Sequence, residues 1–136
     1  MLAVAFVILA VIVIGGVVWA VTGARKVSAR IEEHLAGLDV QLRSRADVHG
    51  IRSKGEKQVR GLGALVLTPD EVVFAQAIPD QVIRVPRSSI TGVNETSEYL
   101  EKTSARPLLH LTWADDDGAW DVGDDLAKWL DALRAT

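Results

Sequence analysis

The sequence contains no cysteine and carries no recognisable catalytic motif. Without cysteine the chain has no disulfide framework, no thiolate ligands for zinc or an iron–sulfur cluster, and no cysteine nucleophile. The histidines His34, His49 and His110 are far apart and form no i, i+4 pair of metal ligands. Gly61 and Gly63 precede a predicted strand instead of following one, which argues against a dinucleotide-binding loop. We therefore expect no enzyme activity, no cofactor and no bound metal.

Acidic residues gather near the C-terminus, but their pattern is not that of a metal site. Six aspartates lie between Asp115 and Asp125, and their spacing does not match an EF-hand loop. Aspartate is common in turns and in the first turn of helices. The cluster therefore predicts a solvated acidic turn and the start of a helix.

Charged residues are also missing from the N-terminal segment. Leu2–Val21 is an apolar run of 20 residues, and the first charged residue is Arg25. As a helix this run would extend about 30 Å, the thickness of a bilayer core. A signal peptide, the alternative, needs a shorter apolar core with basic residues before it. The sequence thus predicts a single-pass transmembrane anchor over residues 1–23.

The residues that flank this run predict its orientation. Arg25, Lys26 and Arg30 follow it, and an excess of basic residues marks the cytoplasmic side of a span. Trp19 has the position of an interfacial aromatic residue, and the three basic residues are candidates for contact with lipid headgroups. We expect a protein of the plasma or inner membrane whose C-terminal domain is cytoplasmic.

Residues 24–58 are predicted to form a juxtamembrane amphipathic helix and a basic connector. Apolar residues recur at intervals of three and four, as on one face of a helix: Val27, Ile31, Leu35, Leu38 and Leu42. This face is a candidate partner surface. The spacing alone leaves open whether it packs on the chain's own domain, pairs with a second copy in a homodimer, or lies on lipid headgroups.

Charge is divided unevenly along the chain. Residues 1–60 carry nine Lys/Arg against five Asp/Glu, whereas residues 61–136 carry six against thirteen, so the net charges are +4 and −7. An acidic domain is repelled by nucleic-acid phosphates and by anionic lipid. We expect no nucleic-acid partner, a membrane contact through the anchor, and a protein partner for the domain.

From residue 61 onward the hydrophobic period changes from 3.6 to 2, which predicts strands. The chain then closes with a helix whose apolar stripe contains Leu126, Trp129, Leu130 and Leu133, with Asp121 or Gly123 as its cap. The predicted strands are 61–67, 72–76, 82–85, 90–94 with an extension towards residue 100, 108–113 and 119–122. The predicted fold class is a transmembrane helix followed by an α+β domain of about six antiparallel strands and one helix.

Some of these residues resemble a known family. Gly61–Thr68, then Glu71–Phe74, then Ile83–Pro86 with Ile90 four residues on, resemble the "G-x-L-x-L-T, strand, I-x-[IV]-P-x-x-x-I" pattern of GRAM and bacterial PH-like domains. The resemblance implies a PH-like barrel over residues 59–136, capped by the C-terminal helix, that serves as a scaffold for lipid headgroups, peptides or proteins. Residues 68–71 are acidic where phosphoinositide-binding members carry basic residues.

These observations favour a membrane-tethered, non-enzymatic interaction module that binds a protein or lipid partner at the membrane. Tethering raises the effective concentration of a weak partner. The alternative is an accessory or structural subunit of a larger membrane complex, assembled through the span and the apolar face of residues 27–42.

Overall fold

A computed structural model describes residues 25–57 and 60–135 of the chain. These residues form a seven-stranded antiparallel sheet in the order β4-β3-β2-β1-β7-β6-β5, followed by a C-terminal helix. The strands are β1 (Leu42–Ile51), β2 (Gly61–Leu67), β3 (Glu71–Gln76), β4 (Gln81–Pro86), β5 (Ile90–Tyr99), β6 (Lys102–Trp113) and β7 (Asp116–Asp121). Short 3₁₀ helices η1 (Arg52–Lys57), η2 (Arg87–Ser89) and η3 (Gly123–Asp125) connect them, and α2 (Leu126–Arg134) ends the fold.

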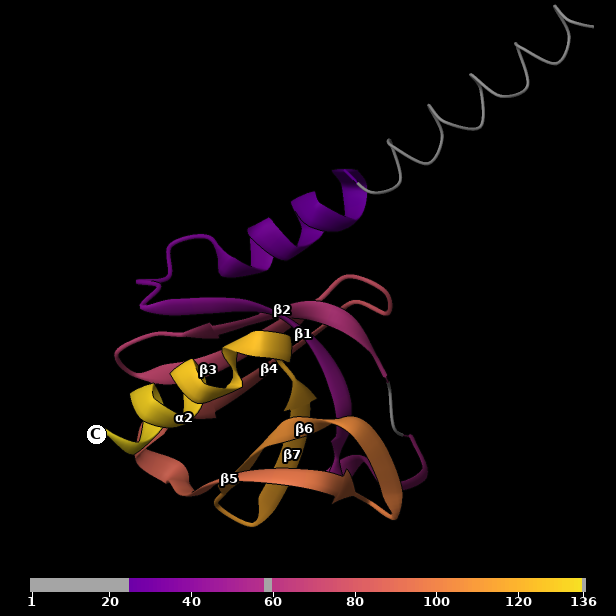
Figure 1. Ribbon diagram of the computed structural model, residues 1–136. Helices are drawn as coiled ribbons and strands as arrows, with labels where there is room; N and C mark the ends of the chain where they lie inside the picture. The colour runs from indigo at the N-terminus through magenta and orange to yellow at the C-terminus, as the bar shows by residue number, and fades with distance from the viewer. Residues whose placement is uncertain (1–24, 58–59, 136) are drawn as a thin grey trace, which may run out of the picture.

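The sheet curls into a half-barrel (Figure 1). Strands β1–β4 form one half and β5–β7 the other, and α2 lies at the open side between them. β1 joins the halves because it pairs with β2 along one edge and with β7 along the other. A bulge between Val48 and Gly50 interrupts the pairing with β7, and bulges let a strand bend.

The predicted fold class was wrong in two respects. The sheet has seven strands instead of about six, because Leu42–Ile51 is the central strand β1 and not the end of an amphipathic helix. In the part of the chain that the structure describes, no helix is long and apolar enough to cross a membrane, contrary to the predicted transmembrane, single-pass architecture. The predicted anchor, residues 1–23 with Trp19, lies outside the described residues.

The missed strand has a physical explanation. Ser44, Ala46 and Val48 of β1 point inward and are buried, while the residues between them are exposed. This is the two-residue period of a strand, but small and polar residues on the inner face hide it from a hydrophobicity pattern. Residues 25–35 are helical, and Gly37, with φ +80°, lies just beyond them, which is a common helix ending.

The inner face of the curled sheet holds the main core, which aromatic side chains dominate. Phe74 and Trp113 both lie against Trp120, with ring centroids 6.2 and 6.1 Å apart. The stripe predicted for the C-terminal helix is confirmed, since Trp129, Leu130 and Leu133 of α2 are buried in this core. Its predicted caps were wrong, because η3 precedes the helix and Asp125 occupies the N-cap position.

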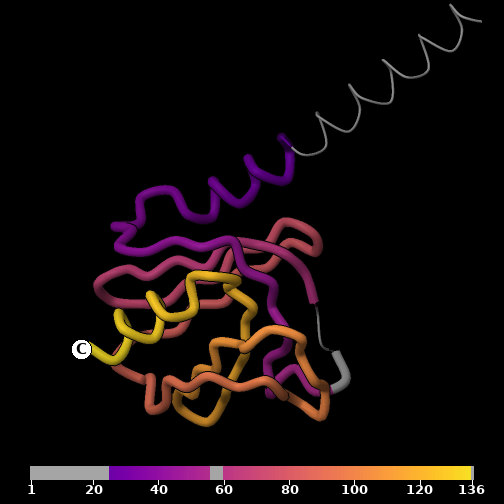
Figure 2. Tube along the Cα trace, viewed as in Figure 1, coloured from indigo at the N-terminus to yellow at the C-terminus, as the bar shows by residue number. Residues whose placement is uncertain are grey.

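A second, smaller core lies on the outer face of β1–β4. The helix at residues 25–35 lies across this face, as the trace in Figure 2 shows. The outer-face core joins the buried Leu35, Ala64, Val66, Val73 and Ala75 with the partly buried Ile31, Leu38 and Val82. The half of the sheet formed by β1–β4 is therefore covered on both sides.

Candidate functional site

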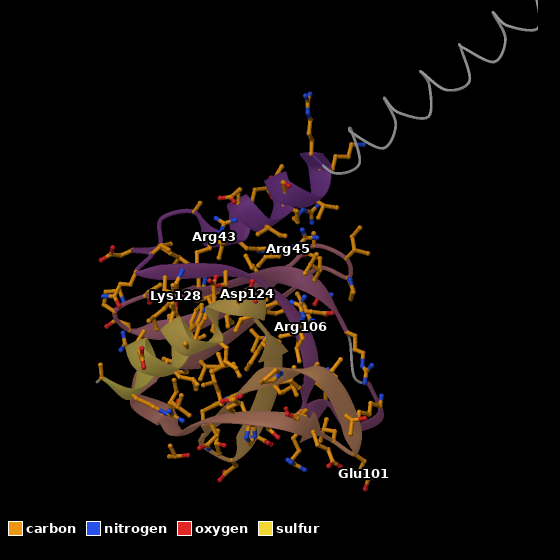
Figure 3. The ribbon with its side chains drawn as sticks, in the orientation of Figure 1. Arg43, Arg45, Glu101, Arg106, Asp124 and Lys128 are labelled. Atoms are coloured by element: carbon orange, nitrogen blue, oxygen red, sulfur yellow. The ribbon has the colours of Figure 1, made fainter. Side chains whose placement is uncertain are left out.

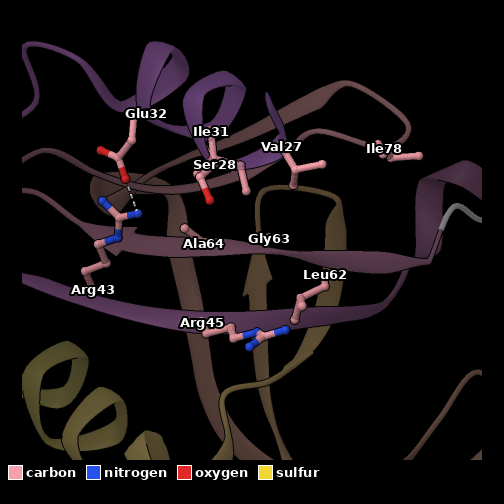
Figure 4. Close-up of a pocket in the computed structure, with 10 residues that line it drawn as sticks. All are labelled: Val27, Ser28, Ile31, Glu32, Arg43, Arg45, Leu62, Gly63, Ala64 and Ile78. Carbon is pink, nitrogen blue, oxygen red and sulfur yellow. Dashed lines mark hydrogen bonds and ion pairs between the residues drawn. The ribbon is translucent and has the colours of Figure 1, made fainter. Parts of the chain in front are cut away.

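A groove of about 660 Å³ lies between the helix at residues 25–35 and the outer face of the sheet (Figure 4). We call it the helix–sheet groove. The helix contributes Val27, Ser28, Ile31 and Glu32; β1 contributes Arg43 and Arg45; β2 contributes Leu62, Gly63 and Ala64; and Ile78 comes from the turn between β3 and β4. Its volume is within the range of pockets that hold small ligands or anchoring side chains.

Exposed aliphatic side chains mark this groove. Among the described residues, the large hydrophobic side chains that are exposed are Ile78 at 73%, Leu62 at 44% and Val40 at 44%. Two of them, Ile78 and Leu62, line the groove. Apolar surface that gathers around a concavity is typical of a binding site, whereas isolated exposed residues carry no such meaning.

The floor of the groove is made of small residues because the backbones behind it approach closely. A Cβ atom on Gly63 would lie 2.1 Å from the Ala75 carbonyl oxygen, so only glycine fits there. Next to it, the buried Gln76 side chain donates to the Ile78 carbonyl at 2.9 Å and accepts from Gln81 at 2.5 Å. These bonds fix the turn that carries the exposed Ile78.

The charged side chains of the groove are of two kinds, paired and unpaired. Arg43 Nη2 donates to Glu32 Oε1 at 2.5 Å, which ties β1 to the helix. The same hydrogen bond holds the pKa of Glu32 below its ordinary value and raises that of Arg43. Arg45 lies two residues further along the same strand face, is exposed, and forms no ion pair with another described residue.

Arg45 and Leu62 also line a second groove of about 390 Å³ on the neighbouring surface, together with Arg106, Val122, Gly123 and the three aspartates Asp121, Asp124 and Asp125. Figure 3 shows Arg45 and Arg106 on the same side of the molecule. The two grooves therefore meet at Arg45 and Leu62. A ligand that occupies either of them contacts this pair of residues.

A different polar cluster surrounds Asp117 on β7. Its carboxylate accepts from Arg52 Nε at 2.5 Å and bonds His110 Nε2 at 2.7 Å, while its backbone carbonyl accepts from the Tyr99 hydroxyl at 2.7 Å. Burial alone would raise the pKa of Asp117, but the bonds from Arg52 and His110 hold it below its ordinary value. Burial also raises the pKa of Tyr99.

The bonds of the Asp117 cluster tie η1 and β6 to β7. The part of the chain that the structure describes places no serine or threonine hydroxyl in hydrogen-bond contact with the His110 ring. Arg52 instead holds η1 against the sheet and lies over the Tyr99 ring at 5.9 Å. The prediction that the aspartates near the C-terminus are all solvated was wrong for Asp117, which is 7% exposed. Within residues 25–57 and 60–135, no three histidine, aspartate or glutamate side chains are placed so that they could hold a metal ion together.

The structure separates the residues of the predicted partner face. Ile31, Leu35 and Leu38 pack on the outer face of the sheet, so among the open alternatives they contact their own domain. Val27 lines the helix–sheet groove. Leu42 belongs to β1 and packs against the main core, which separates it from the other four residues. A partner contact for this face stays a prediction.

The basic residues predicted to contact headgroups lie on the helix at residues 25–35. Arg25 and Lys26 are exposed. Arg30 donates to Asp80 at 2.6 Å and lies 3.8 Å from Glu33, and His34 bonds the other Asp80 oxygen at 2.5 Å. Arg30 is thus committed to an ion pair that fastens the helix to the turn between β3 and β4.

Sequence reasoning missed the residues that distinguish the groove, namely Arg43, Arg45, Leu62 and Ile78. The available signal was the position of Arg43 and Arg45 two residues apart, which places both on one face of a strand. That signal has meaning only after β1 is recognised. Leu62 and Ile78 carry no sequence signal, because an aliphatic residue is equally expected in a core.

No family model matches the chain, and no similar curated protein was found. The chain is similar to a solved structure, the C-terminal domain of an unknown protein from Leishmania infantum, with 13% sequence identity and a TM-score of 0.53. The alignment covers 85% of this chain and 95% of that chain. At this identity the similarity shows the fold alone, and the resemblance to GRAM and bacterial PH-like domains stays a prediction.

Proposed function

We propose that this protein is a non-catalytic interaction module that holds a segment of a protein partner in the helix–sheet groove. The observation that carries the proposal is the grouping around one concavity of Leu62, Ile78 and Arg45, which forms no ion pair with any other residue that the structure describes. Interface hot spots are enriched in arginine and lie in pockets that become desolvated on binding, so Arg45 is the expected anchor of this groove.

The walls of the groove support a binding role because they are fixed in place. The helix at residues 25–35 is held by the buried Leu35 and by the ion pairs that Asp80 and Arg43 make with it. The opposite wall, β2, is hydrogen-bonded to β1 and β3 on its two sides. A site whose walls are already ordered loses less entropy when it binds.

The same geometry favours binding over catalysis. Catalysis requires a nucleophile or general base held by an orienting group close to a reacting atom. The groove offers guanidinium groups, one carboxylate already paired with Arg43, the Ser28 hydroxyl and aliphatic side chains, and the structure gives Ser28 no hydrogen bond to a base among the described residues. These groups recognise and anchor a ligand, which is the basis for proposing a module without enzymatic activity.

Site-specific photocrosslinking of the full chain in its native cells tests this proposal. A photoreactive residue in place of Leu62 is expected to give a discrete protein adduct. The reference position is Thr103, which is exposed on β6 far from the groove in the fold. A photoreactive residue there is expected to give no adduct. A second variant then tests whether the groove itself must be open.

Ser28→Trp places a large ring in the groove from the helix, and Ala29→Trp is its matched control. Ser28 lines the groove and is exposed, while Ala29 is equally exposed and does not line it. We expect Ser28→Trp to abolish the adduct formed from position 62 and Ala29→Trp to preserve it. An adduct that persists in Ser28→Trp, or that forms equally from Thr103, would show that the groove is not the site.

A further inference from the structure

We propose that Arg45 and Leu62 together recognise a carboxylate next to an aliphatic side chain, so that the partner segment is acidic and apolar. The inference rests on the proposed function and adds the chemistry of the partner to it. Three observations carry it. Arg45 forms no ion pair within residues 25–57 and 60–135, Leu62 is exposed and lines the same groove, and the neighbouring Arg43 already holds the Glu32 carboxylate.

The neighbouring position shows how such a carboxylate is held. Arg43 and Arg45 lie on the same face of β1. Arg43 donates to the carboxylate of Glu32, which belongs to the helix on the opposite wall of the groove (Figure 4). An arginine fork matches the geometry of a carboxylate. Arg45 offers the same fork two residues away, and it forms no ion pair with a carboxylate of the described residues.

The position of Arg45 gives it a central role. Arg45 and Leu62 line both the helix–sheet groove and the adjoining groove that contains Arg106. The adjoining groove also contains Asp121, Asp124 and Asp125, which would repel a carboxylate, so the acidic segment is expected in the helix–sheet groove. The aliphatic requirement comes from Leu62, Val27 and Ile78, which line the same concavity as Arg45.

A protein segment fits these charges better than a lipid surface. Residues 61–136 carry a net charge of −7, whereas the walls of the groove contain Arg43 and Arg45 against Glu32. A bilayer would bring its negative surface close to the acidic part of the domain as well as to the groove. A peptide segment contacts the groove alone and avoids this repulsion.

The test measures fluorescence anisotropy of two short labelled peptides with the full chain, one of alternating leucine and glutamate and one of alternating leucine and glutamine. We expect the glutamate peptide to bind about tenfold more tightly, the size of one hydrogen-bonded charge pair. Arg45→Gln is expected to remove this preference. Vesicles with and without anionic phospholipid serve as the competing ligand.

Glu32→Gln sharpens the test because it should have the opposite effect. Removing the internal carboxylate frees Arg43, so the glutamate peptide should bind about threefold more tightly through a second guanidinium, a gain typical of a partly exposed ion pair. Glu33→Gln is the control, because it removes the same charge from the next residue, which contacts Arg30 and not Arg43.

Three results would overturn the inference: equal affinity for the two peptides, a preference that survives Arg45→Gln, or tighter Arg45-dependent binding to anionic vesicles than to the glutamate peptide. If the adduct from position 62 still forms in that case, the groove binds a protein by another chemistry and the proposed function stands. If the adduct is absent and the peptide preference is present, the carboxylate site stands and the proposed function fails.

Discussion

The two faces of the sheet half formed by β1–β4 are built in different ways. Large side chains pack together at the inner face, among them Phe74 of β3, Trp120 of β7 and Trp129 of α2, and all three are fully buried. The outer face carries mostly small residues such as Ala64 and Ala75, covered by one helix. Ion pairs at the surface hold this helix in place. The helix does not cover the outer face completely, and the helix–sheet groove stays open between them.

Because the two faces are built differently, we expect one to contribute mainly to stability and the other mainly to binding. Buried aromatic area provides the largest stabilisation per residue, so the inner face is expected to determine the stability of the fold. Small side chains under a helix leave room that a partner can fill. We therefore propose the outer face as the recognition surface and expect it to contribute less to stability.

The largest expected effect is on the inner face. Trp129→Ala removes a fully buried ring and should lower the free energy of unfolding by about 3–5 kcal/mol. The loss is measured by denaturant unfolding of the full chain. Trp129→Phe is the control, because it keeps most of the ring volume and loses the 2.9 Å bond to Ser44, for an expected loss of about 1 kcal/mol. An unchanged stability in Trp129→Ala would mean that α2 is misplaced.

The matching change on the outer face is Leu35→Ala. Leu35 is 5% exposed and packs on the small residues of β2 and β3. We expect a loss of about 2 kcal/mol, at the low end for leucine truncation, because the helix can settle closer to alanine side chains. The same unfolding measurement checks it. A loss equal to that of Trp129→Ala would remove the difference between the faces.

The Asp117 cluster belongs to neither face, and its contribution depends on pH. Asp117→Asn weakens the bonds to Arg52 and His110 and should lower stability by about 1–2 kcal/mol near neutral pH, since Arg52 is exposed enough to return to water.

The folded-state pKa of Asp117 lies below its ordinary value of 3.8. The stabilisation is therefore full above that value and disappears as pH falls through the lower folded pKa. Unfolding curves of both proteins at several pH values should converge below it. A difference that stays constant down to strongly acidic pH would contradict the ion pair.

The smallest effect is expected from the surface ion pairs of the helix at residues 25–35. Asp80→Asn removes the acceptor of Arg30 and His34, both of which keep access to solvent. We expect a small drop in Tm that vanishes at about 1 M salt, where the screening length is about 3 Å. Asp70→Asn, in the turn between β2 and β3, is the control for loss of a charge. A salt-independent drop would show that Asp80 has a packing role.

The sequence predicted the elements that follow simple periodic rules. The strands from residue 61 onward were found as apolar runs between turn residues, such as the buried run of β2, and the stripe around Trp129 was found because its apolar residues recur at helical spacing. β1 was missed because its inward residues Ser44 and Ala46 are small or polar, and because Leu38 and Leu42 happen to be spaced as in a helix. Tertiary contacts decided the structure there.

The candidate site was less accessible to sequence reasoning than the fold. Val27 and Ile31 were identified as part of an interaction face, and both line the groove. Arg45 and Ile78 become neighbours of this face only when the sheet forms, since they are distant along the chain. The Asp117 tie was missed for the same reason, because its partner Arg52 is 65 residues away.

Amide NMR of the full chain, titrated with the peptide of alternating leucine and glutamate, tests the central claim most directly. If the outer face is the recognition surface, the largest shift changes should fall in residues 27–32, 43–45 and 62–64, with little change in α2 or β5. The largest changes in α2 or along β5, with the groove residues unmoved, would contradict the assignment of recognition to the outer face.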